Sequence, residues 1–191
     1  ALTIGNSPGN DLRFSDEKVE ASRNFANKIW NASRFVLMNF DDDIDFSKVD
    51  EGKFTLPDKW ILSRINALTR EVTENMEKFE LGIALQKVYE FIWEEFCDWY
   101  IELVKPRLYD RDSEGRLEAQ FVLNYVLGTA MKLLHPYMPF ITEEIYTHLI
   151  NDDESIMISK WPEYNEKYSF PEEEKKMRIV MDAIRNIRNI R

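Results

Sequence analysis

Five side chains between Asn24 and Asn39 can act together if this stretch is helical. At about 100° per residue they fall within roughly 80° of arc on one side of the helix; they are Asn24, Lys28, Asn31, Phe35 and Asn39. An aromatic ring stacks on an unpaired nucleobase, amides bond the edges of the base, and an ammonium group holds a phosphate. These residue types together predict a face that contacts unpaired RNA.

The flanks of this face leave alternatives open. Arg23, Trp30 and Arg34 lie to one side of it, and both arginines have alternative partners in Glu20 or in the acidic residues that follow the helix. Asn27 points about 80° away from the centre of the cluster. For Phe35 the alternative is that its ring packs beneath a neighbouring loop, as an apolar side chain ordinarily does.

Other chemistry finds little support in the sequence. Glu90, Glu94 and Asp98 recur every fourth residue, as in the carboxylate row of a di-iron bundle, but neither His135 nor His148 has a glutamate three residues before it. A solvated acidic face, or pairing with basic neighbours, explains this row better. We find no glycine-rich phosphate loop, nucleophile elbow or zinc-ligand cluster, so we expect no metal, no cofactor and no catalytic residue in this chain.

The charge distribution restricts where RNA can bind. The net charge of the 191 residues is −10 and the sequence pI is about 4.8, which opposes nonspecific binding to a phosphate backbone. Residues 41–58 hold seven acidic and two basic side chains, a net of −5, whereas residues 1–40 hold five basic and four acidic ones, a net of +1. The first helix is therefore compatible with RNA, and the acidic stretch is not.

Cysteine use and hydropathy indicate the compartment. The single Cys97 lies in an aromatic-rich stretch and is expected to be a small buried side chain. The chain has neither a basic and apolar leader nor an apolar run near the roughly 20 residues of a membrane span. We expect a cytoplasmic protein that does not contact membranes.

Helical periodicity and few glycines or prolines predict an all-α fold, a bundle of about five helices. Pro106 is expected to end the third helix, and Ser113 to cap the fourth. The predicted helices cover residues 15–40, 57–77, 80–105, 114–134 and 139–150. We divide the chain into a turn-rich leading segment (1–14), the bundle (15–150), an extended strap (151–170) and a last helix (171–191).

The last helix carries isoleucines between arginines, in a narrow apolar stripe beside a basic one. An interface helix explains this pattern best, and direct contact with RNA is the alternative. Because the stripe is narrow and runs to the last residue, it also suggests the start of a truncated coiled coil.

Four stretches resemble one family in order along the chain. Residues 23–36, Arg-Asn-Phe-Ala-Asn-Lys-Ile-Trp-Asn-Ala-Ser-Arg-Phe-Val, resemble the start of the anticodon-binding domain of valyl-tRNA synthetase. The other matching strings are residues 5–14 (Gly-Asn-Ser-Pro-Gly-Asn-Asp-Leu-Arg-Phe), 95–100 (Glu-Phe-Cys-Asp-Trp-Tyr) with Lys105-Pro106, and 134–144 (Leu-His-Pro-Tyr-Met-Pro-Phe-Ile-Thr-Glu-Glu). The resemblance covers essentially the whole chain.

The resemblance implies a parent enzyme, a class I aminoacyl-tRNA synthetase that uses ATP in a catalytic domain upstream of this region. The implied partners are the anticodon loop of tRNA(Val) and the catalytic domain of the same chain, and we expect a monomer. The implied tRNA-binding residues are Phe35 for base stacking, Asn31 for base edges and Lys28 for a phosphate or base acceptor, followed by Asn24, Asn27, Arg34, Arg23 and Arg13. Arg13 has the missing domain as an alternative partner. The alternatives for the whole chain are the related isoleucyl, leucyl or methionyl domain and a mainly structural helical spacer.

Overall fold

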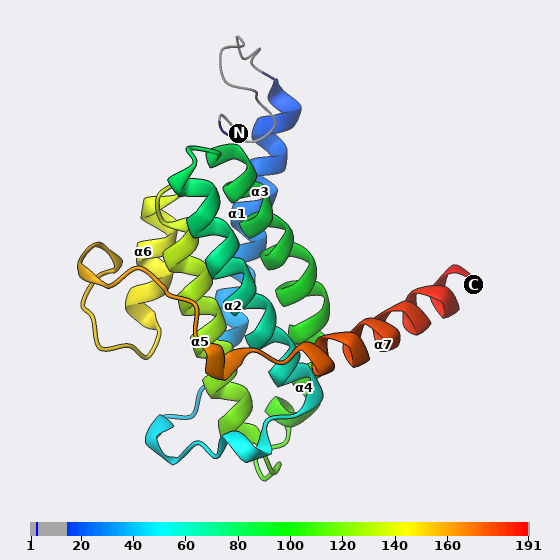
Figure 1. The fold of residues 1–191 in the computed structure, drawn as a ribbon. Helices are drawn as coiled ribbons and strands as arrows, with labels where there is room; N and C mark the ends of the chain where they lie inside the picture. Colours follow the sequence, from blue (N-terminus) through cyan, green and yellow to red (C-terminus); the bar gives the residue numbers. More distant parts are fainter. Residues whose placement is uncertain (1–2, 4–14, 191) are drawn as a thin grey trace.

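The computed structural model describes Thr3 and residues 15–190, and these form helices joined by loops (Figure 1), which confirms the all-α prediction. The helices are α1 (Asp16–Met38), α2 (Leu56–Glu77), α3 (Leu81–Glu90), α4 (Ile101–Tyr109), α5 (Arg116–Leu134), α6 (Pro139–His148) and α7 (Pro171–Asn189). A π-helical segment, Phe91–Tyr100, joins α3 to α4, so residues 81–109 form one continuous helix. Five helices in the described part of the chain therefore build the bundle, and α7 leaves it.

The first two helices begin at the expected residues. The Ser15 side chain accepts a hydrogen bond from the Lys18 backbone N–H, and acidic residues fill the first turn of α1, where the helix dipole favours them. Pro57 lies in the first turn of α2, and Thr55 and Asp58 form a capping box. Between the two helices the acidic stretch is a loop with two short 3₁₀ turns, Phe46–Lys48 and Glu51–Lys53.

The predicted stop at Pro106 is wrong, because the helix continues through Pro106 to Tyr109. Proline removes one backbone donor, which ordinarily ends or kinks a helix. Here the next turn is held by its side chains: Leu108 is buried, and the Arg107 guanidinium donates to the Asp58 carboxylate at 2.6 Å. Tertiary contacts thus outweigh the lost hydrogen bond.

The predicted cap of the fourth helix at Ser113 is also wrong. Helix α5 begins at Arg116, after Gly115 adopts a left-handed conformation with φ of 81°. Glycine takes this conformation without steric cost. The buried Arg116 side chain fixes the start, because it pairs with Asp41 at 2.8 Å and also donates to the Leu108 carbonyl.

A buried polar cluster joins the start of α2 to the continuous helix of residues 81–109. The Asp58 side chain is fully buried and accepts hydrogen bonds from the Tyr100 hydroxyl at 2.8 Å and from Arg107. It also accepts from the Thr55 backbone N–H and hydroxyl. A buried charge is stable only when paired and hydrogen-bonded, and this cluster satisfies that condition.

The strap, residues 151–170, crosses the bundle and is fixed mainly to α2. The Asn66 side chain exchanges two hydrogen bonds with the Asn165 backbone, at 2.8 Å each, and the Trp161 indole donates to the Thr73 hydroxyl. Helix α7 then projects away from the bundle (Figure 1). Only Met177 and Met181 of α7 are buried, whereas Ile187 and Ile190 are 67% and 88% exposed.

Candidate functional site

Helix α1 buries one side against the bundle, broadly as its periodicity predicts. Its buried residues are Phe25, Ile29, Ala32, Ser33 and Val36. Val19 shares the same side by helical periodicity but is 44% exposed, because it lies near the outer end of the helix.

A groove of about 460 Å³ runs between α1 and the continuous helix of residues 81–109, which we call the facing helix. Five of the sequence-predicted residues line it: Asn24, Asn27, Lys28, Asn31 and Phe35. Ala32, Cys97, Ile101 and Lys105 complete the lining. None of these nine residues, all within the described part of the chain, has an acidic side chain, so the groove offers amide groups, ammonium groups and apolar surface.

Phe35 lies at the boundary between the groove and the core. Its side chain is half-buried and packs against core residues, so it matches neither a ring free in solvent nor a ring fully covered by a loop. The Lys105 Nζ atom of the facing helix lies 5.8 Å from the ring centroid. Asn39 is not part of the groove lining, because it ends α1 and donates from its side chain to the Phe35 carbonyl. Because the ring lines the groove, its exposed part is a candidate stacking surface.

Lys28 is held in place by two side chains of the facing helix. Its Nζ atom lies 2.7 Å from the Asp98 carboxylate and 3.8 Å from the centroid of the Trp93 ring. The Lys28 side chain is 23% exposed, compared with 53% for Asp98. The ammonium group is thus oriented before any ligand binds, but part of its charge is already neutralised.

The three asparagines of the groove are available to a ligand. Asn24, Asn27 and Asn31 are exposed, and within residues 15–190 none of their side-chain amides makes a hydrogen bond. Asn27 lines the groove although it points away from the centre of the predicted cluster. The groove therefore includes a residue of α1 that lies outside the predicted helix face.

Of the predicted arginines, Arg23 and Arg34 do not line this groove. Arg23 is exposed and lies 3.4 Å from Glu20, one of the alternative partners that the sequence offered. Arg34 is exposed and is not among the lining residues. Arg13 lies outside the described residues. The positive charge at the groove thus comes from Lys28 and Lys105.

Sequence reasoning missed the second wall of the groove. Cys97, Ile101 and Lys105 are spaced by four residues and share one face of the helix, which is the signal that could have found them. Burial raises the pKa of the Cys97 thiol to about 12, so the thiol is neutral at physiological pH. Cys97 is therefore a neutral, partly apolar part of the groove wall.

The carboxylate row on this helix forms no metal site. Asp98 pairs with Lys28, and Glu90 accepts a hydrogen bond from Gln86. In the described part of the chain no three histidine, cysteine or carboxylate side chains are placed to share a metal ion.

Among the described residues no helix combines the length and apolar character needed to cross a bilayer.

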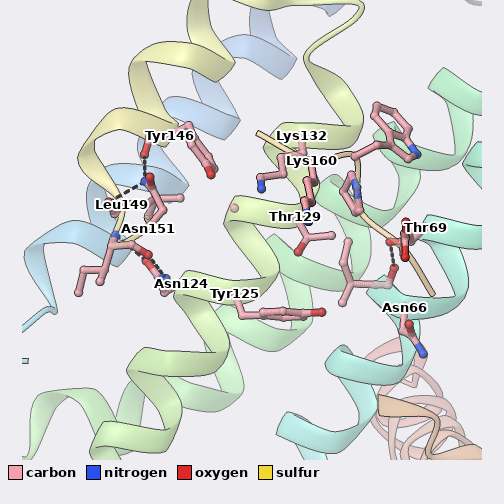
Figure 2. A pocket seen from close by; sticks show the side chains of 16 residues that line it. Asn66, Thr69, Asn124, Tyr125, Thr129, Lys132, Tyr146, Leu149, Asn151 and Lys160 are labelled. Carbon is pink, nitrogen blue, oxygen red and sulfur yellow. Dashed lines mark hydrogen bonds between the residues drawn. The ribbon is translucent and has the colours of Figure 1, made fainter. Parts of the chain in front are cut away.

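A second pocket, of about 320 Å³, lies where the strap crosses α2 and α5 (Figure 2). Most of its amide groups are used internally. Asn124 exchanges hydrogen bonds with the Ile150 backbone, and Asn151 donates to the carbonyls of Tyr146 and Leu149. These bonds fix the loop after α6, so the polar lining of this pocket serves mainly to hold the fold.

Comparison with known proteins gives two results. A family model described as "Anticodon-binding domain of tRNA ligase" matches residues 58–191. The chain is 59% identical to the valine–tRNA ligase of Clostridium perfringens and 58% identical to that of Clostridium acetobutylicum, over 190 residues in each case. It is 50% identical to the valine–tRNA ligase of Bacillus thuringiensis subsp. konkukian over 191 residues. Each alignment covers 100% of this chain but 22% of the relative, so the chain spans about a fifth of the length of these proteins.

Proposed function

Because the chain belongs to the anticodon-binding domain family of tRNA ligases, we propose that it recognises the anticodon loop of tRNA(Val) through the groove between α1 and the facing helix. Its role is to position the tRNA for aminoacylation by the catalytic part of a valine–tRNA ligase. The domain itself supplies no catalytic residue and no cofactor, and ATP acts in the catalytic part. We propose a monomeric, cytoplasmic parent enzyme, in which α7 leads into a coiled coil.

The observation that carries this proposal is the composition of the groove. Three asparagine amides that make no hydrogen bond within residues 15–190, one half-buried phenyl ring and two ammonium groups line the same groove. Asn24, Asn27 and Asn31 each offer a donor and an acceptor to a base edge. The open face of Phe35 stacks on an unpaired base, and Lys105 contacts a phosphate.

The arrangement favours recognition over a purely structural spacer. A spacer needs no row of unbonded asparagines along one helix, since each costs a few tenths of a kcal/mol of helix propensity relative to alanine. The overall charge remains acidic, and only two lysines serve the groove. Binding by the isolated chain is therefore expected to be weak and strongly dependent on salt.

Binding of a fluorescently labelled anticodon stem-loop, followed by fluorescence anisotropy, tests the proposal. Phe35→Ala removes the stacking surface and is expected to weaken binding by about 1 kcal/mol or more, roughly fivefold. Asn31→Ala should weaken binding without altering the salt dependence.

The matched control is Phe40→Ala, which removes another half-buried phenyl ring of the core periphery outside the groove. Thermal unfolding of both variants separates lost contacts from lost stability. The proposal is wrong if Phe35→Ala and Phe40→Ala affect binding equally, or if the wild-type chain does not bind the stem-loop.

A further inference from the structure

Large apolar side chains are exposed together at one end of the bundle. Phe79 is 84% exposed and lies in the turn between α2 and α3, followed by Leu81 at 43% and Ile83 at 49%. Phe140, at the start of α6, is 91% exposed. We name these four residues the apolar end.

A hydrogen bond joins the two turns that carry these residues. The Tyr137 hydroxyl, in the turn between α5 and α6, donates to the Leu81 carbonyl at 3.0 Å. The two turns lie at the same end of the bundle in Figure 1. Isolated exposed apolar residues are ordinary, but several at one place mark an interaction surface.

The backbone of Phe79 adds a second, independent observation. Its φ of 60° is left-handed, and it is the only non-glycine residue with a positive φ in the described part of the chain. The turn is a Schellman motif, in which the Glu80 N–H donates to the Asn75 carbonyl at 2.8 Å. Glycine or asparagine normally takes this position, because a bulky side chain is strained there. A phenylalanine with a strained backbone and an exposed ring does not stabilise the domain itself.

The position of Thr3 indicates what covers this surface. A Cβ atom built at Gly82, in the first turn of α3, would lie only 3.0 Å from the Thr3 carbonyl oxygen. Thr3 therefore lies against the first turn of α3, three residues after Phe79. The relatives are several times longer than this chain.

We propose that the apolar end is the docking surface for the part of the parent enzyme that precedes residue 1, and that Phe79 is its central anchor. The inference rests on the proposed function only in requiring that this chain is one domain of a longer ligase. The docked segment presents an apolar pocket to the ring, since the exposed side chains at this end are aromatic and aliphatic. The strain at Phe79 is then offset by burial in the whole enzyme and not within the domain.

The test compares Phe79→Asn in the 191-residue chain and in the full-length parent enzyme. Asparagine tolerates the left-handed conformation, so the short chain should keep or raise its melting temperature and keep its affinity for the anticodon stem-loop. In the full-length enzyme the same change should lower kcat/KM for tRNA by about five- to a hundredfold, the usual range of coupling between sites.

Ile158→Asn is the matched control, because Ile158 is 70% exposed on the strap, away from the apolar end. It should leave kcat/KM unchanged in the full-length enzyme. Full activity of the full-length Phe79→Asn enzyme would overturn the inference. Sedimentation that shows Phe79-dependent dimers of the short chain would also overturn it, by assigning the surface to a second copy. Failure of the proposed function is distinguishable, because it appears as absence of stem-loop binding by the wild-type chain.

Discussion

Replacing Asp98 by Asn tests how the groove controls its own charge. The Asp98 carboxylate lies 2.7 Å from the Lys28 Nζ atom and lies beside, but not in, the groove lining. Asparagine has nearly the same shape and retains an oxygen that accepts from Lys28. The substitution therefore removes one negative charge and leaves the ammonium group close to its present position.

The expected effect is modest, because the pair is partly solvated. Two unit charges about 4 Å apart interact by about 1 kcal/mol in water. The Asp98 side chain is 53% exposed, and exposed pairs contribute about 0–1 kcal/mol. We expect Asp98→Asn to tighten binding of an anticodon stem-loop by up to about fivefold at low salt. It should also steepen the dependence of log K on log salt concentration by about 0.7, as for one more phosphate contact on a single strand.

Fluorescence anisotropy titrations between about 50 and 200 mM salt measure both quantities. Glu94→Gln is the control, because it removes the same charge from the same helix, one turn earlier and outside the groove. If Asp98→Asn and Glu94→Gln change the affinity and the salt slope equally, the pair with Lys28 has no local role in binding. Weaker binding by Asp98→Asn would refute the reasoning and would indicate that orientation of Lys28 matters more than its net charge.

Three further predictions concern the second wall of the groove and the buried cluster. Lys105→Gln should weaken stem-loop binding and reduce the salt slope by about 0.7; an unchanged slope would remove Lys105 from the phosphate contacts. Asp58→Asn should lower the free energy of unfolding in urea by about 3 kcal/mol or more, because it leaves the Arg107 charge unpaired beside Tyr100, whereas a loss below about 1 kcal/mol would show that the cluster adapts. Cys97 should react with iodoacetamide more slowly in the native chain than in urea, and equal native and unfolded rates would contradict the burial of the thiol. Because burial raises the pKa of the folded Cys97 thiol to about 12, the contribution of this thiol to stability should fall as the pH rises above the ordinary thiol pKa of 9.0.

The fold was largely predictable because the strongest signals were local. Ser15 and Pro57 mark helix starts through hydrogen bonds and a fixed φ angle that involve only a few neighbouring residues. The errors occurred where distant residues decide. The helix passes Pro106 because Arg107 reaches Asp58, 49 positions earlier, and α5 starts at Arg116 because its side chain reaches Asp41, 75 positions earlier.

The site was predicted as one helix face, and the structure shows a groove between two helices. Helical periodicity brought Asn24, Lys28, Asn31 and Phe35 together correctly. It does not say which helix packs beside α1, so neither the lysine at position 105 nor the pairing of Lys28 with Asp98 was foreseen. The half-burial of Phe35 depends on its packing against core residues, and the sequence left the exposure of this ring open between two interpretations.

The strap has a consequence for the order in which the molecule folds and opens. Its hydrogen bonds with Asn66 join residues 99 positions apart, and the bond from Trp161 to Thr73 spans 88 positions. Closing such long loops costs entropy before the contacts are formed, so these contacts are expected late in folding. The same few bonds hold a segment with exposed Met157 and Ile158, so the strap is expected to detach before the helices separate. Amide hydrogens of the strap should then exchange with solvent faster than those of α2, and proteases should cut the native chain first within residues 151–170.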